Sequence, residues 1–206
     1  MKKLKTITLI TNTELLNIRK TLNLCHKLSN VGLKRIQIRE KRLDKKELIN
    51  FIKKIKENVE EDCKLFLNGN LKLATELKLD GCHMPENAEV NKIDLDQKIQ
   101  LGRSIHQNTL NPNPNNIFNY FHVGPVFPTL THPSQAPITE KKIINLTKNL
   151  DNIIFVGGIN LKNVEKLFNY NFSGIAVMRE LLLSSDVDYT FLKLNEILNG
   201  KNKNNN

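Results

Sequence analysis

Short apolar runs alternate with segments of helical periodicity along the whole chain. Leu15, Ile18, Leu22 and Cys25 recur at spacings of three and four residues, which predicts an amphipathic helix. Similar patterns predict further helices over 48–59, 73–77, 161–168 and 189–197. The apolar runs between the helices predict strands over 6–11, 35–39, 64–68, 81–84, 100–105, 120–123, 152–156 and 174–177.

This alternation predicts an α/β fold, and its number of units favours a single (β/α)8 TIM barrel in a chain of 206 residues. An open doubly wound sheet has the same alternation, but no GxGxxG motif follows the first strand. We expect the barrel over 1–199 and a disordered polar tail over 200–206. The NPNPNN sequence within 107–119 should keep the fifth helix short or irregular.

Composition and charge narrow the functional classes. The net charge is +10, but lysine and asparagine are abundant along the entire sequence, so we expect no nucleic-acid partner. No run approaches the roughly 18 apolar residues of a transmembrane helix, and the short apolar start reads as a strand, so no membrane partner is expected. The three cysteines lack CxxC spacing, which argues against a disulfide framework or zinc site and favours a cytoplasmic location.

Two predicted strands end in polar residues that share one face. Side chains alternate along a strand, so Gln37, Arg39 and Lys41 point the same way at the end of the second strand. Inside a barrel such groups are costly unless they meet an anion or lie at the open rim. Ser104 and His106 share a face at the end of the fifth strand, where barrel enzymes place their chemistry.

Polar residues and glycines follow other strands. Asn68 ends the third strand, and His83, which ends the fourth, is expected to be structural. The proline-rich loop 124–134 carries Thr129, Thr131 and His132, and its stiffness favours binding. The glycine pair after the seventh strand would let backbone N–H groups approach a phosphate, with two residues after the eighth strand completing the site. These four residues are Gly157, Gly158, Met178 and Arg179.

Taken in order, these segments resemble the thiamine phosphate synthase / TenI superfamily. The matching segments are QIREK at 37–41, LFLNG at 65–69, DGCHM at 80–84, GRSIH at 102–106, GPVFPTLT at 124–131, VGGI at 156–159 and GIAVM at 174–178. The resemblance implies condensation of a hydroxymethylpyrimidine diphosphate with a thiazole phosphate, with loss of diphosphate. Magnesium would help to hold the diphosphate.

The resemblance also implies roles for individual residues. His106, Ser104 and Lys41 are the expected catalytic residues. Gln37, Arg39, Lys41, Asn68 and Ser104 would bind the pyrimidine and its diphosphate. Residues around the thiazole phosphate would be Thr129, Thr131, His132, Gly157, Gly158, Met178 and Arg179.

The chain departs from the synthase pattern at its metal ligands. Gly69 and Ala88 stand where the family has the two aspartates that bind magnesium, with Glu86 and Glu89 displaced from the second position. The sequence therefore leaves the metal site unknown, because Mg²⁺ normally uses one or two carboxylates beside phosphates. A lysine of the family's loop is His132 here, and a phosphate-loop serine is Arg179.

These departures keep other functions open. LFLNG and GRSIH look like TenI-type thiazole tautomerases, which lack the metal pair and use a histidine at the position of His106 for proton transfer. The TLTHPSQAP stretch looks like the synthase-like domain fused to MutT-type Nudix hydrolases. A non-catalytic binder of phosphorylated ligands is a third hypothesis. The expected partners are small phosphorylated pyrimidine and thiazole ligands, and the sequence leaves a homo-oligomer open.

Overall fold

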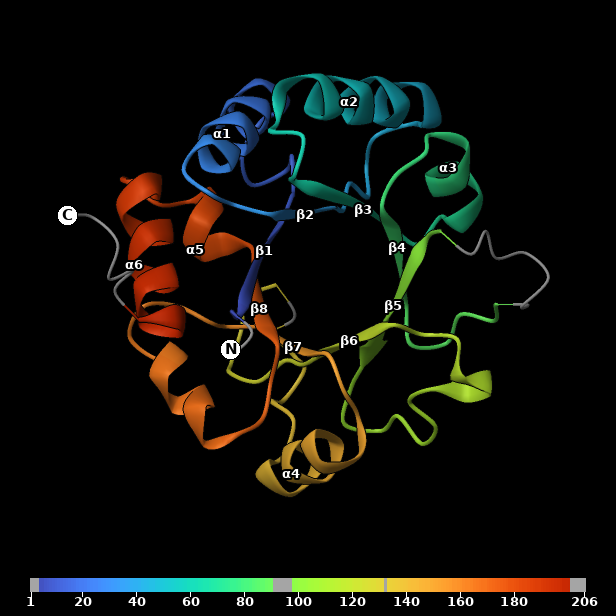
Figure 1. The fold of residues 1–206 in the computed structure, drawn as a ribbon, viewed down its shortest axis with the longest axis vertical. Helices are drawn as coiled ribbons and strands as arrows, with labels where there is room; N and C mark the ends of the chain where they lie inside the picture. The colour runs from blue at the N-terminus through green and yellow to red at the C-terminus, as the bar shows by residue number, and fades with distance from the viewer. Residues whose placement is uncertain (1–3, 91–97, 132, 201–206) are drawn as a thin grey trace.

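Eight parallel strands close into a ring, with helices around the outside (Figure 1). The computed structural model describes residues 4–90, 98–131 and 133–200. Each strand pairs with its neighbours in sequence, and β8 pairs with β1 to close the barrel. The predicted single (β/α)8 barrel is therefore confirmed. The strands are β1 (Thr6–Ile10), β2 (Arg35–Ile38), β3 (Lys64–Asn68), β4 (Gly81–Met84), β5 (Gln100–Ile105), β6 (Tyr120–Val123), β7 (Ile153–Val156) and β8 (Gly174–Val177).

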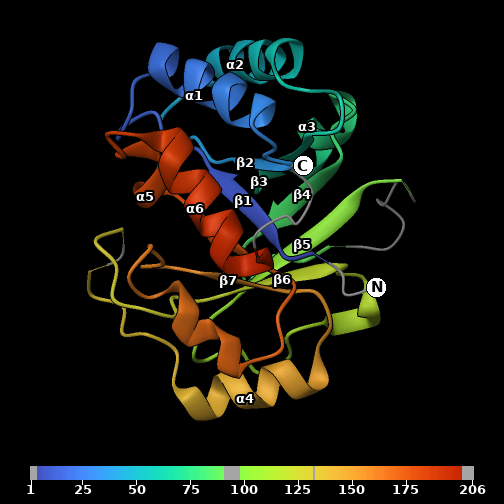
Figure 2. The ribbon, with the colours of Figure 1, turned by 60° about the vertical axis from the view of Figure 1, so that its left-hand side comes forward.

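The helices form the outer layer. They are α1 (Ile18–Asn30), α2 (Lys45–Asn58), α3 (Leu71–Glu76), α4 (Glu140–Asn149), α5 (Arg179–Leu182) and α6 (Val187–Asn199), with 3₁₀ helices η2 (Pro114–Asn116) and η3 (Val164–Asn169). Asp44 and Glu47 form a capping box that fixes the start of α2. At the other end of the chain, Asn199 of α6 exchanges hydrogen bonds with the backbone of Lys5, just before β1. Figure 2 shows α6 on the outside of the barrel, in front of the strands.

Strand alternation separates two apolar cores. Outward-facing residues such as Leu9, Ile36 and Leu67 are almost fully buried under the helices. The inward-facing core is smaller and lies inside the barrel; it consists of Ile10, Phe66, Tyr120, Ile154 and Ala176. The polar side chains that follow along the same strands lie beyond this inner core, toward the carboxyl ends of the strands.

The helical predictions needed correction where the segments are short. The segment predicted as a helix over 161–168 forms the 3₁₀ helix η3, whose start at Asn163 has no side-chain cap. The proline-rich stretch contains only η2, as expected for a broken helix. The sequence pattern does not predict α4 or α5. Among the described residues, no helix is long and apolar enough to cross a membrane.

Strand and tail boundaries also differ slightly from expectation. β7 begins at Ile153 because Asn152 has a φ of 53°, which is outside the β region. Gly200, the first residue of the predicted tail, ends α6 with a φ of 79° and donates its N–H to the carbonyl of Glu196. Residues 201–206 lie outside the described part of the chain.

Candidate functional site

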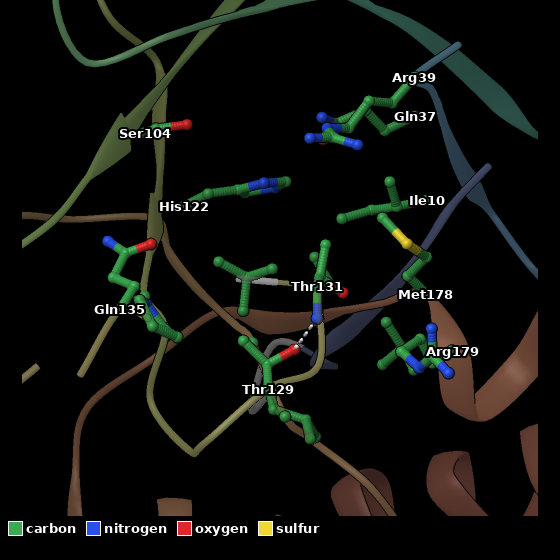
Figure 3. A pocket seen from close by; sticks show the side chains of 18 of the residues that line it. Ile10, Gln37, Arg39, Ser104, His122, Thr129, Thr131, Gln135, Met178 and Arg179 are labelled. Carbon is green, nitrogen blue, oxygen red and sulfur yellow. Dashed lines mark hydrogen bonds between the residues drawn. The ribbon is translucent and has the colours of Figure 1, made fainter. Parts of the chain in front are cut away.

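A cavity of about 480 Å³ opens at the carboxyl ends of the strands (Figure 3). Barrel enzymes place their active sites at this end, because loops from several strands converge there. All but one of the predicted site residues line the cavity. They are Gln37, Arg39, Lys41, Asn68, Ser104, His106, Thr129, Thr131, Gly157, Gly158, Met178 and Arg179. The exception, His132, lies outside the described residues.

The end of β2 brings an amide and two cations to the rim. Gln37 is buried, and its Nε2 donates to Oδ1 of Asn68 at 3.0 Å, while its own Oε1 has no partner among the described residues. Arg39 is half-buried and Lys41 exposed. Burial lowers the pKa of Arg39, and the nearby carboxylates of Glu40 and Glu14 oppose that shift. These groups are suited to an anion that enters the cavity.

Glu40, which was not predicted as a site residue, holds the backbone next to these cations. Its carboxylate accepts hydrogen bonds from the backbone N–H of Thr13 at 2.8 Å and from the hydroxyls of Thr13 and Thr11. Oγ1 of Thr11 in turn accepts from the N–H of Arg39 at 3.1 Å. Glu40 therefore ties the end of β2 to the end of β1. Glu40 itself is not among the residues that line the cavity.

His106 is held by the loop after β6. Its Nδ1 lies 2.7 Å from the carbonyl oxygen of Gly124, which can only accept a hydrogen bond. Nδ1 must therefore carry the proton of the neutral ring, which leaves Nε2 as a proton acceptor. Nε2 of Gln135 lies 3.3 Å from Nδ1, but it is itself a donor and cannot accept this proton. The Gly124 carbonyl is therefore the group that orients the imidazole.

A pair of histidines lies deeper in the barrel. His83 and His122 are both buried, and their rings are tilted by 32° to one another with centroids 4.1 Å apart. Burial, followed by the charge of Arg35, lowers the pKa of His83 to about 3. Burial and the neighbouring His83 also lower the pKa of His122 well below its usual value. Both rings are therefore neutral at physiological pH, and Figure 3 shows His122 extending into the middle of the cavity.

The ends of β7 and β8 form a second polar region. Gly157 and Gly158 have φ values of 94° and 69°, and a Cβ on Gly158 would lie 2.4 Å from the carbonyl oxygen of Pro128. Their N–H groups have no protein partner among the described residues. Arg179, which begins α5 after β8, lines the same cavity without an ion-pair partner in the described part of the chain (Figure 3). These donors suit a phosphate group.

The charges that line the cavity are unbalanced. Arg39, Lys41 and Arg179 are cationic, whereas Glu180 is the only carboxylate among the described lining residues. One oxygen of Glu180 accepts the N–H of Leu161 at 3.1 Å. The cavity is therefore electropositive and suited to anionic ligands.

The described residues do not fit a magnesium ion. Gly69 has no side chain to offer, and Ala88 packs against the apolar core. The carboxylate of Glu86 accepts the hydroxyl of Thr109, and Glu89 is exposed; neither lines the cavity. Within residues 4–90, 98–131 and 133–200, no group of three or more His, Cys, Asp or Glu side chains could hold a metal ion.

Comparisons with known proteins identify the family. The family model described as "Thiamine monophosphate synthase" matches residues 7–181. The chain belongs to this family. It is 34% identical over 172 residues to the thiamine-phosphate synthase of Prochlorococcus marinus subsp. pastoris, covering 80% of this chain and 49% of that protein. It is 27% identical over 176 residues to the thiamine-phosphate synthase of Methanococcus vannielii, covering 81% and 84%.

A solved structure shows the same fold. Thiamine phosphate pyrophosphorylase from Pyrococcus furiosus superposes with a TM-score of 0.79 at 19% identity, covering 94% of this chain and 95% of that one. At that identity the likeness shows the fold alone. The family match and the named relatives make the chain thiamine phosphate synthase-like, an enzyme of the transferase kind.

Several residues that line the cavity were not predicted as site residues from the sequence. His122 shares a face with Tyr120 on β6, and the same alternation that was applied to β5 would have indicated that it points inward. His83 was expected to be structural, yet it lines the cavity beside Ser104. Gln135 carried no usable signal, because its position depends on how the proline-rich loop folds back over the barrel.

Proposed function

We propose that this chain condenses hydroxymethylpyrimidine diphosphate with thiazole phosphate. The observation that supports it is a single electropositive cavity with two separate groups of anion-binding donors. One group is at the end of β2, and the other is at the ends of β7 and β8. A reaction that joins two phosphorylated molecules needs both groups at once.

In this proposal, the position of each residue in the cavity decides which substrate it binds. Arg39 and Lys41 bind the diphosphate, and Asn68 and Ser104 contact the pyrimidine. Gly157, Gly158 and Arg179 bind the thiazole phosphate with Met178 beside it, while Thr129 and Thr131 contact it from the loop after β6. Holding both reactants in one cavity replaces a bimolecular encounter with a positioned one.

The chemical step needs stabilisation of negative charge. The bond between the pyrimidine methylene and the diphosphate oxygen breaks, and the electron pair leaves with the diphosphate. The lone pair of the thiazole nitrogen then forms the new C–N bond. Arg39 and Lys41 neutralise the charge that develops on the leaving group. No step is assigned to magnesium, because the described residues supply no carboxylate pair for it.

The test is direct assay of the purified full chain. Both phosphorylated substrates are supplied, and the joined product is measured by chromatography, with excess Mg²⁺ and separately with EDTA. Product is expected in both conditions. Absence of product in both would overturn the proposal, and thermal stabilisation by the two ligands without turnover would make the chain a non-catalytic binder instead.

One observation favours a second candidate, a thiazole tautomerase. The Nδ1 contact of His106 with Gly124 leaves Nε2 free to take a proton from one carbon of a thiazole carboxylate phosphate and return it to another. Such an isomerisation needs no metal. It predicts turnover with EDTA that falls at least 100-fold in His106→Gln; unchanged turnover in that variant would exclude it.

The proposal extends to the setting of the reaction. The partners are small phosphorylated pyrimidine and thiazole ligands, with no nucleic acid or membrane involved. A single barrel domain over 1–199 and a cytosolic location remain predictions, and the three free, buried cysteines agree with a reducing compartment.

A further inference from the structure

Four polar side chains form a connected series inside the barrel, running down from the cavity. Oγ of Ser104 lies 2.9 Å from Nε2 of His83, and Nδ1 of His83 lies 3.3 Å from the hydroxyl of Tyr120. Below them the guanidinium of Arg35 lies over the ring of Tyr120, with Cζ 4.0 Å from the ring centroid. Distances alone do not say which atom of each pair carries the proton.

Arg35 closes the lower end of the series. A guanidinium has only donors, so it cannot accept the proton of the Tyr120 hydroxyl. Among the described residues, Nδ1 of His83 is the only hydrogen-bonding partner of that hydroxyl that can accept its proton.

The hydrogen bond from Tyr120 fixes the tautomer of His83, and with it the hydrogen bond to Ser104. The buried ring is neutral, so only one of its nitrogens carries a proton. If Nδ1 accepts from Tyr120, Nε2 carries the proton and donates to Oγ of Ser104. The reverse arrangement would bury the O–H of Tyr120, a residue 3% exposed, without an acceptor, which proteins avoid.

We propose that Arg35, Tyr120 and His83 are positioning residues that make Ser104 a hydrogen-bond donor toward the ligand. Because Oγ of Ser104 accepts from His83, its own proton is free to point into the cavity. Ser104 therefore recognises an acceptor atom, such as an unprotonated ring nitrogen or a phosphate oxygen. The identity of that ligand rests on the proposed function, but the direction of the hydrogen bonds does not.

His83 and His106 are therefore expected as opposite tautomers. His83 carries its proton on Nε2, whereas His106 carries it on Nδ1, where it donates to Gly124.

NMR of ¹⁵N-histidine-labelled protein at neutral pH tests this expectation. The chain has only five histidines, so their side-chain nitrogens can be resolved. The His83→Gln and His106→Gln variants assign the two signals. An Nε2–H tautomer of His83 is the expected result, and an Nδ1–H tautomer would overturn the proposal. This outcome is independent of turnover, so it is distinguishable from failure of the proposed synthase reaction.

A double-mutant cycle tests whether the effect passes through Ser104. The probe is inorganic pyrophosphate, with hydroxymethylpyrimidine diphosphate as a second ligand, and affinity is measured by calorimetry. Tyr120→Phe should weaken binding of the pyrimidine ligand about 3–10-fold in the native background and hardly at all in the Ser104→Ala background.

Tyr189→Phe, on the exposed surface of α6, is the matched control. Equal weakening in both backgrounds would show a merely structural role. The tautomer of His83 in the native protein decides the question if Tyr120→Phe does not fold.

Discussion

At the scale of the residue, Arg39 and Arg179 are the most informative side chains of the cavity. Neither guanidinium has an ion-pair partner among the described residues; Arg39 follows β2 and Arg179 follows β8. We expect Arg39→Gln and Arg179→Gln each to weaken substrate binding about 10–100-fold, since a charge-assisted hydrogen bond contributes roughly 1.5–3 kcal/mol. Under the proposed assignment, Arg39→Gln raises the KM for the pyrimidine substrate and Arg179→Gln that for the thiazole substrate.

The control is Arg19→Gln, which removes an exposed arginine of α1 away from the cavity. It lowers the net charge by the same amount and should leave both KM values unchanged. Equal effects of the two cavity variants on both substrates would contradict the division into two anion-binding regions.

Residue-level prediction succeeded where strand alternation decided the outcome. The inward direction of Gln37, Arg39, Ser104 and His106 follows from their positions at the ends of β2 and β5 or directly after them. It failed for contacts between distant segments: nothing in the sequence indicates that Glu40 binds Thr11 and Thr13.

At the scale of the element, β5 depends on a glycine that makes room for a ring. A Cβ on Gly102 would lie 2.0 Å from Cζ of Tyr120, which is buried in the inner core. We expect Gly102→Ala to lower the free energy of unfolding by about 3 kcal/mol or more, because the ring of Tyr120 has no room inside the closed barrel to move away from the added methyl group. Urea denaturation measures the change.

Gly69→Ala separates crowding from backbone strain. A Cβ on Gly69 meets no atom within 4 Å, but its φ of 78° is unfavourable for alanine. This variant should cost only about 1–2 kcal/mol. If Gly102→Ala were no more destabilising than Gly69→Ala, the ring of Tyr120 would not be confined as described.

Elements with a strong pattern were predictable, and weakly patterned ones were not. The strands were located within about a residue, because each is a buried apolar run with glycine or polar residues at its ends. The short α5 has only four residues, too few to show a period, and η3 has the apolar spacing of a helix without a cap.

At the scale of the whole molecule, the two buried histidines make stability depend on acidity. The pKa of His83 is lowered to about 3 and that of His122 well below its usual value. The unfolded chain therefore binds more protons than the folded one below pH of about 6.5. Stability should be fully present above that pH and fall as the pH drops, by at most about 1.4 kcal/mol per pH unit for each histidine.

Urea unfolding at pH values between about 4 and 8 measures how the free energy of unfolding changes with pH. His83→Gln should flatten this dependence by up to one proton, and His26→Gln, at an exposed position, controls for loss of a histidine as such. A slope that is the same in His83→Gln and in the native chain would contradict the assignment of a neutral buried ring.

The cluster of Phe66, Arg35 and Tyr120 fills the barrel below the cavity. The guanidinium lies 3.7 Å and 4.0 Å from the two ring centroids. Under the proposed function, both substrates must then enter from the carboxyl ends of the strands. The molecule that binds deeper has to bind first and leave last. Turnover should therefore be ordered, and product-inhibition kinetics should show one product competing with only one of the two substrates.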